Sequence, residues 1–202
     1  MTAIIEPIRD RDGNLHYHDK DGKLHRDDGP ALEWFSGDRE WYHDGRLDRI
    51  DGPARELADG TRQWYCEGRL HRDGGPAIEW ESGNQDWYQH GLLDRSDGPA
   101  QEFVDGTKEW FRKGKLHRGD GPAVLSPDGF EEWWSCGVPV PKHFIEHHKQ
   151  LCEAMSYEVL SELMGKFRLA SVDTVQSETT QALSIIFDHK PSVSSTKKIR
   201  PN

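Results

Sequence analysis

The sequence predicts a mainly β protein, in which an elongated antiparallel sheet of tandem 23-residue β-hairpin repeats is followed by a C-terminal α-helical cap. The first observation is that four residue types recur at a step of 23 residues. Their positions are Gly22, Gly45, Gly68, Gly91, Gly114 and Gly137; Pro30, Pro53, Pro76, Pro99 and Pro122; Trp41, Trp64, Trp87, Trp110 and Trp133; and Arg26, Arg49, Arg72, Arg95 and Arg118. The second is that this period ends after residue 137, where apolar residues take up helical spacing. Five copies of one unit therefore fill roughly residues 22–137.

A second period of 46 residues lies on top of the first. His25, His71 and His117 alternate with Asp48 and Asp94 at one position of the unit. This alternation indicates that a pair of units was duplicated, so neighbouring units present different side chains. A degenerate copy at residues 12–16 is expected to open the array.

Each unit reads as a hairpin of two short aromatic-rich strands, at residues 31–35 and 39–43 in the first copy. A type II′ turn at Gly37-Asp38 places Trp34 opposite Trp41. A type I′ turn at Ser36-Gly37 loses that pair. We favour the first register, because cross-strand aromatic pairs contribute roughly 0.2–1 kcal/mol each. Gly45 marks the turn after the second strand.

With two strands per unit, each repeat advances ~9–10 Å, and five repeats make a sheet ~45–50 Å long. Alternation of side chains places Trp34 and Trp41 on one face. The other face carries a row of rings, namely Tyr42, Tyr65, Tyr88, Phe111 and Trp134. We expect part of this row to stay open or to be closed by a second copy of the chain, a homodimer.

Each of four arginines has a glutamate seven residues further on, as Arg26 has Glu33. We expect an internal arginine–carboxylate ladder that ties each turn to the next strand. The alternative is a row of anion sites, which the acidic charge of this region disfavours. The predicted partner-binding residues are the five rings together with Arg49, Arg72 and Arg95, because aromatic rings and arginine are enriched at interface hot spots.

The histidines are expected to be structural. His25, His71 and His117 lie about four strands apart, ~19 Å, so they cannot share one metal ion. Each is expected to form a hydrogen bond with a neighbouring turn. His143 and His147 lie one helical turn apart, but no further ligand accompanies them. We predict no metal site, no cofactor and no catalytic residues, since enzyme signatures are absent and the array supplies near-copies of every group.

The predicted organisation is a repeat array over residues 1–140, a helical segment over 141–188 and a disordered tail over 189–202. Apolar residues from Phe144 to Met155 recur at helical spacing. Ser156 and Asp173 are candidate caps of a second and a third helix. The helices are expected to close the open end of the array, as terminal segments of solenoids do.

The net charge is −10, and residues 141–202 carry eight basic and seven acidic residues, which leaves −11 in residues 1–140. That charge disfavours direct nucleic-acid or membrane binding and permits a basic protein partner. The three cysteines form no paired pattern, and no signal peptide or membrane-spanning run is evident. We expect a cytoplasmic protein.

The pattern Trp-Tyr-x-x-Gly-x-Leu-His-Arg-x-x-Gly-Pro-Ala at residues 64–77 resembles MORN-type β-hairpin repeats. It is most similar to the divergent YwqK-like, antitoxin-like variants, whose His-Arg-x-x-Gly-Pro-Ala units occur in phage and bacterial genomes. The resemblance covers about residues 12–137. It implies scaffolding or protein binding, without catalytic residues.

The sequence thus favours a protein-binding repeat scaffold, an accessory or inhibitor protein of phage or bacterial origin that binds a host protein. One alternative is an acidic mimic of nucleic acid that blocks a DNA- or RNA-binding enzyme. Another is a binder of a small ligand such as a nucleotide, at an interface between repeats or between two chains.

Overall fold

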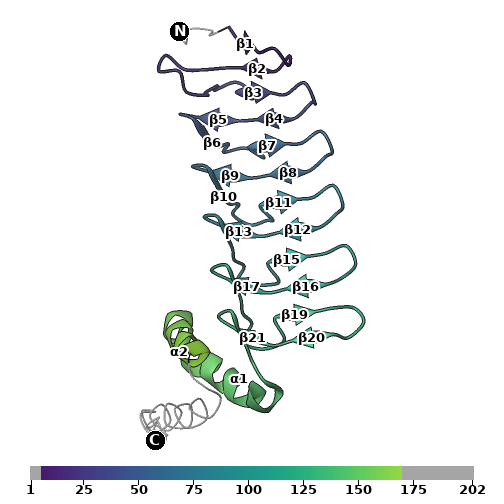
Figure 1. The fold of residues 1–202 in the computed structure, drawn as a ribbon, viewed down its shortest axis with the longest axis vertical. Helices are drawn as coiled ribbons and strands as arrows, with labels where there is room; N and C mark the ends of the chain where they lie inside the picture. The colour runs from purple at the N-terminus through teal and green to yellow at the C-terminus, as the bar shows by residue number, and fades with distance from the viewer. Residues whose placement is uncertain (1–5, 170–202) are drawn as a thin grey trace, which may run out of the picture.

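The computed structural model describes residues 6–169 and has the shape of a ladder with a small helical unit at its C-terminal end (Figure 1). A 12-stranded antiparallel sheet of consecutive hairpins runs along the ladder. The predicted fold class is therefore confirmed: tandem β-hairpin repeats followed by C-terminal helices.

Every strand of the ladder is two residues long. The long sheet contains, in spatial order, β1 (Ile8–Arg9), β2 (Leu15–His16), β3 (Leu32–Glu33), β4 (Arg39–Glu40), β7 (Arg55–Glu56), β8 (Arg62–Gln63), β11 (Ile78–Glu79), β12 (Gln85–Asp86), β15 (Gln101–Glu102), β16 (Lys108–Glu109), β19 (Val124–Leu125) and β20 (Glu131–Glu132). All neighbours are antiparallel, and residues 12–16, the predicted degenerate copy, contribute β2 and part of the loop to the opening hairpin β1–β2.

A second row of hairpins lies beside the long sheet (Figure 1). Its five two-stranded sheets pair β5 (Tyr42–His43) with β6 (Arg46–Leu47), β9 (Tyr65–Cys66) with β10 (Arg69–Leu70), β13 (Tyr88–Gln89) with β14 (Leu92–Leu93), β17 (Phe111–Arg112) with β18 (Lys115–Leu116), and β21 (Trp134–Ser135) with β22 (Val138–Pro139). Each unit thus forms two hairpins. Trp41 lies where the chain passes from one row to the other: its amide donates to Ala54 and its carbonyl accepts from Asp48.

The register of the hairpins in the long sheet differs from both predicted registers. Leu32 pairs with Glu40, and Glu33 pairs with Arg39. The Trp34 amide donates to the Asp38 carbonyl, so a three-residue loop, 35–37, connects the strands. Gly37 has φ of 96°, which only glycine adopts at low cost and which closes a type I turn with a glycine bulge. In the next unit the Asp59 carboxylate also accepts the Thr61 amide at 2.7 Å. Loop closure by these groups outweighs the aromatic pairing on which the prediction relied.

The shift of register also corrects the assignment of faces. Trp34 and Trp41 do not share a face, because the register is displaced by an odd number of residues. The indole of Trp80, which corresponds to Trp34, donates to buried Asp86 at 2.8 Å. Position 34 therefore lies on the same face as the predicted tyrosine row, and the tryptophans at position 41 lie on the opposite face.

The core of the array is thin. One alanine per unit has no exposed surface, and these are Ala31, Ala54, Ala77, Ala100 and Ala123. Each lies at the start of the first strand of its unit, as Ala77 does when its amide donates to Asp86 and its carbonyl accepts from Trp64. Side chains of the hairpin loops also connect neighbouring units: Asp38 accepts the Ala58 amide at 2.7 Å and Asn84 accepts the Val104 amide at 2.8 Å.

The helical unit covers the last repeat. It consists of η1 (Lys142–Phe144), α1 (Ile145–Ala154) and α2 (Tyr157–Leu169). The Tyr157 hydroxyl donates to the carbonyl of Arg112, and Lys113 forms an ion pair with Glu158 at 2.7 Å. A cluster of buried apolar side chains lies here, around Cys136, Leu151, Leu160 and Met164.

The predictions for the C-terminal part are tested only in part, because some concern residues that the structure does not describe. Ser156 immediately precedes α2, as expected for a capping residue. The third helix expected from Asp173 and the disordered tail expected from residue 189 lie outside the described residues. No helix of residues 6–169 is both long enough and apolar enough to cross a membrane.

Candidate functional site

The arginines that recur every 23 residues, beginning with Arg26, form the expected internal ladder. Arg95 is representative: its Nε donates to Asp97 at 2.9 Å, and its Nη1 donates to the Pro99 carbonyl at 3.1 Å and to Glu102 at 2.9 Å. Its guanidinium carbon lies 4.0 Å from the ring centre of Trp87. Charge-assisted bonds and stacking on an indole together fix the guanidinium plane.

The same arrangement repeats along the array with small changes. Glutamate accepts from Arg26, Arg49 and Arg72 at 3.2, 3.3 and 2.7 Å. Each guanidinium lies over an aromatic ring, which is Tyr17 for Arg26 and the tryptophan eight residues earlier for Arg49, Arg72, Arg95 and Arg118. The predicted arginine–carboxylate ladder is thus confirmed, and the sequence had not indicated the stacking partner.

Three clefts, which we call the arginine clefts, lie between successive arginine turns. The first lies between the turns at 26–29 and 48–51, the second between 72–75 and 94–97, and the third between 95–99 and 117–120. Their volumes are about 540, 420 and 470 Å³. A tryptophan lines each one, namely Trp41, Trp87 and Trp110. The array therefore offers the same cleft more than once, in one orientation, along one side.

The charge of the clefts changes along the array. The first is lined by four aspartates and two arginines. The second and third are each lined by three arginines and two aspartates. Arg112 accounts for much of this difference, because it lines both of the latter clefts and, within residues 6–169, its side chain forms an ion pair only with Asp94, at 3.3 Å. A ligand that spans the row would meet acidic groups first and basic groups later.

The predicted row of rings lies in the second row of hairpins and is half-buried. The Tyr42 hydroxyl donates to Glu40 at 2.8 Å, and burial followed by this bond raises the pKa of Tyr42 to about 12. The Tyr65 hydroxyl donates to Gln63 at 3.2 Å. At the far end, Phe111 and Trp134 line a cavity of about 370 Å³ together with Ser161 of α2. The helices thus border the C-terminal end of the row.

Beneath these rings runs a row of buried polar groups that the sequence did not single out. Glu40, Gln63 and Asp86 are at most 8% exposed and occupy equivalent positions. Glu40 pairs with Arg55 at 3.0 Å, and Asp86 accepts from Trp80 and from Gln101. Burial, with smaller contributions from Glu132 and Asp86, raises the pKa of Glu109. The sequence feature that could have indicated this buried row is a polar residue on the strand face that also carries the apolar Leu32 and Ile78.

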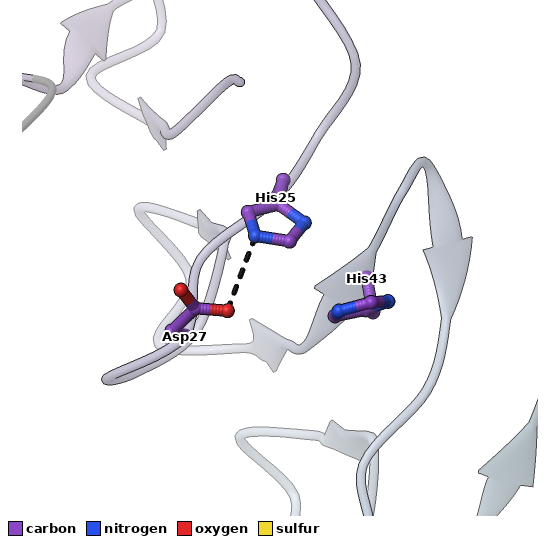
Figure 2. Close-up of side chains that lie close together, drawn as sticks. All are labelled: His25, Asp27 and His43. Carbon is purple, nitrogen blue, oxygen red and sulfur yellow. Dashed lines mark ion pairs between the residues drawn. The ribbon is translucent and has the colours of Figure 1, made fainter. Parts of the chain in front are cut away.

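The histidines of the 46-residue period make the hydrogen bonds that we expected. Nδ1 of His25 accepts the amide of Asp44 at 3.1 Å, Nδ1 of His71 accepts that of His90, and Nδ1 of His117 accepts that of Cys136. The sequence did not predict that His25 and His71 each have a second histidine beside them. The ring centres of His25 and His43 lie 4.8 Å apart, and Asp27 lies next to both (Figure 2).

The helical unit buries a group of titratable side chains against the last repeat. His148 has no exposed surface, its Nε2 lies 3.3 Å from Sγ of Cys152, and its Nδ1 has no partner. Burial, followed by the charges of His148 and Arg112, lowers the pKa of His117 to about 4. Burial raises the pKa of Cys152 to about 12, so its thiol is a poor nucleophile.

The predicted site residues therefore fall into three groups, one of which, Tyr65 and Tyr88, begins strands β9 and β13 of the second row of hairpins. Arg49, Arg72 and Arg95 line the arginine clefts, and Tyr42 reaches the first of them. Phe111 and Trp134 line the cavity beside α2 instead. A comparison with protein-family models gave no match to the chain, and a comparison with curated proteins gave none either.

Proposed function

We propose that this chain is a cytoplasmic repeat scaffold that binds a partner protein and catalyses no reaction. The row of arginine clefts supports this proposal most directly, because clefts of one kind that recur along one side of the array suit an extended segment of a partner. Each repeat advances ~9–10 Å, which an extended peptide covers in about three residues. One partner segment can thus meet the same cleft several times.

The rigidity of the cleft walls also supports binding. Each arginine of the ladder is held by one or two carboxylates, a carbonyl and an aromatic ring before any partner arrives, so little side-chain entropy is lost when a partner binds. Arginine, tryptophan and tyrosine are the residue types most enriched at interface hot spots. The resemblance to MORN-type and YwqK-like repeats implies the same class of function and is consistent with an accessory or inhibitor role.

The arrangement of the carboxylates favours this function over an acidic mimic of nucleic acid. Asp28, Asp51, Asp97 and Asp120 each pair with the arginine two residues earlier. Glu33 and its equivalents pair, from the next strand, with Arg26, Arg49, Arg72 and Arg95. A mimic needs unpaired carboxylates in a regular row, whereas each of these carboxylates is paired with an arginine of its own unit.

A photo-crosslinking experiment tests the proposal. Ser96 is exposed and lines both the second and the third cleft, whereas Ser82 is exposed at a hairpin loop of the long sheet. A photoreactive residue at position 96 should crosslink a distinct partner from host lysate, and the same residue at position 82 should not. Equal labelling from both positions, or none from either, would contradict the proposal.

The third cleft also supports a second candidate function, binding of a small anionic ligand. Arg95, Arg112 and Arg118 line it, and Tyr157 of α2 closes one side. Three cationic side chains in one cleft suit a phosphate group. Thermal unfolding with a nucleotide panel tests this candidate: a rise in Tm that Arg112→Gln abolishes supports it, and no rise with any nucleotide rejects it.

A further inference from the structure

The side chains of His25, Asp27 and His43 converge at the edge of the first arginine cleft (Figure 2). Nε2 of His25 lies 3.1 Å from the Asp27 carboxylate. The ring of His43, from β5, lies beside that of His25, with an angle of 51° between the planes. Each residue offers one ligand atom, and these three atoms lie within 4.8 Å of one another.

We propose that His25, Asp27 and His43 bind a divalent transition-metal ion, with Zn²⁺ as the best match. Two imidazole nitrogens and one carboxylate oxygen form a donor set that zinc proteins use, with ligand bonds of about 2.0–2.2 Å. Ligand atoms around a tetrahedral zinc are therefore about 3.3–3.5 Å apart. The required contraction is small, because the side chains of His43 and Asp27 are 59% and 66% exposed and free to rotate.

The surrounding charges favour a cation at this place. In the described part of the chain, Asp27 and Asp44 form ion pairs only with histidines, whereas Arg26 is neutralised by Asp28 and Glu33. Asp44 also provides the outer partner that zinc-bound histidines usually have, since its Oδ1 lies 3.5 Å from Nδ1 of His25. Neither carboxylate has an arginine with which the metal would compete.

Binding requires one proton to change place. Without metal, Nδ1 of His25 accepts the Asp44 amide, so the neutral ring carries its proton on Nε2 and donates it to Asp27. With metal, Nε2 binds the ion through its lone pair, and the proton moves to Nδ1, where it faces the Asp44 carboxylate. The ring stays neutral, no proton is released, and the hydrogen bond to the Asp44 amide is lost.

The chain contains a natural control two units further on. His71 lies 3.6 Å from Asp73 and stacks on His90, with ring centres 4.4 Å apart and planes only 10° apart. A bound metal lies in the plane of each imidazole ligand. Stacked parallel planes do not meet, so this pair cannot share an ion, whereas the tilted rings of His25 and His43 can. The proposal therefore assigns metal binding to one of two similar clusters.

Calorimetric titration with ZnCl₂ tests the proposal. All proteins carry His147→Gln, which removes the exposed pair of His143 and His147 on η1 and α1 as a competing site. We expect one equivalent of Zn²⁺ to bind, with affinity at least about tenfold lower in His43→Gln or Asp27→Asn. His90→Gln should leave the affinity unchanged. Zn²⁺ should also raise Tm in the parent and not in His43→Gln.

A second readout locates the metal. In the parent, Ni²⁺ should broaden the imidazole NMR signals of His25 and His43 first, and those of His71 and His90 only at higher concentration. Unchanged binding in His43→Gln, equal losses in His43→Gln and His90→Gln, or broadening that begins at His71 would each overturn the proposal. The outcome is independent of whether the clefts bind a partner protein.

Discussion

At the scale of single residues, the arginine of each unit has several partners at once. In all five units a carbonyl four residues on accepts from it, and an aromatic ring lies beneath it. A carboxylate two residues on also accepts from every arginine but Arg72, and a glutamate seven residues on accepts from every arginine but Arg118. The sequence predicted the glutamate from its spacing. It could not predict the stacking, because the tryptophan eight residues earlier becomes a neighbour only through the turn between them.

Replacing Arg95 with lysine should therefore be costly. A lysine ammonium has neither the planar fork that reaches Asp97, Pro99 and Glu102 together nor the flat face that stacks on Trp87. We expect Arg95→Lys to lower the free energy of unfolding by about 1–2 kcal/mol, measured by urea denaturation. Arg62→Lys is the matched control, since Arg62 is 62% exposed and its ion pair with Glu79 spans 4.0 Å. Equal effects of the two changes would contradict this account.

The half-buried tyrosines give a second prediction. Tyr65 and Tyr88 lie in the middle of the array, away from the helices, and are only partly covered. We expect Tyr65→Ala or Tyr88→Ala to weaken partner binding by ~1–2 kcal/mol. Calorimetry with the purified partner protein, once photo-crosslinking has identified it, measures this loss. Circular dichroism should show an unchanged fold, because the buried alanines and the arginine ladder remain. If either change unfolds the chain, the row is structural and its assignment to a binding surface is wrong.

At the scale of elements, the sequence predicted the period, the hairpins and the first two helices, and it failed on register. Glycine at position 37 is compatible with a two-residue or a three-residue loop, and pairing of aromatic rings suggested the shorter one. The sequence predicted only a turn at Gly45 where the structure has the second row of hairpins, because two-residue strands leave almost no alternation of side chains to detect. Residue spacing shows where the chain turns, whereas the partner of each strand depends on hydrogen bonds across the sheet.

The turns of the second row are strained in most units. Asp44, Glu67, His90, Lys113 and Cys136 have φ near 50°, and each is followed by a glycine that also has positive φ. This is a type I′ turn, which prefers Asn-Gly. We expect Glu67→Asn to raise the free energy of unfolding by about 0.5–1 kcal/mol in urea denaturation. Glu67→Gln removes the same charge without favouring positive φ, so a similar gain from Gln would refute the explanation.

The joint between the last repeat and the helices should weaken in acid. Because burial lowers the pKa of His117 to about 4 from an ordinary value of 6.5, the unfolded state binds the proton more readily. Stability is therefore complete above about pH 6.5 and falls towards pH 4, by at most about 3 kcal/mol. Urea denaturation between pH 7.5 and 4.5 measures the loss, which His117→Gln should reduce. An NMR titration in which His117 takes up its proton near pH 6.5 would contradict this prediction.

At the scale of the whole molecule, repetition determines both the shape and the proposed function. A linear array buries little apolar surface per unit, and a cluster of buried apolar side chains lies under the helices at one end. What the array does provide is the same cleft at several places along one side, with a gradient of charge. The sequence predicted an elongated binding surface and the arginines that line it. The sequence did not predict the charge gradient, because it depends on the position of Arg112 between two clefts.

The central claim is that the clefts act together on one partner, and changing their number tests it most directly. Deletion of residues 49–94 removes one 46-residue period and keeps the remaining units in phase. Small-angle scattering should show a rod shortened by about 19 Å. The dissociation constant of the partner that photo-crosslinking identifies, measured by calorimetry, should rise at least roughly tenfold, because fewer clefts remain in contact with it. An unchanged dissociation constant in the shortened, folded chain would contradict the claim.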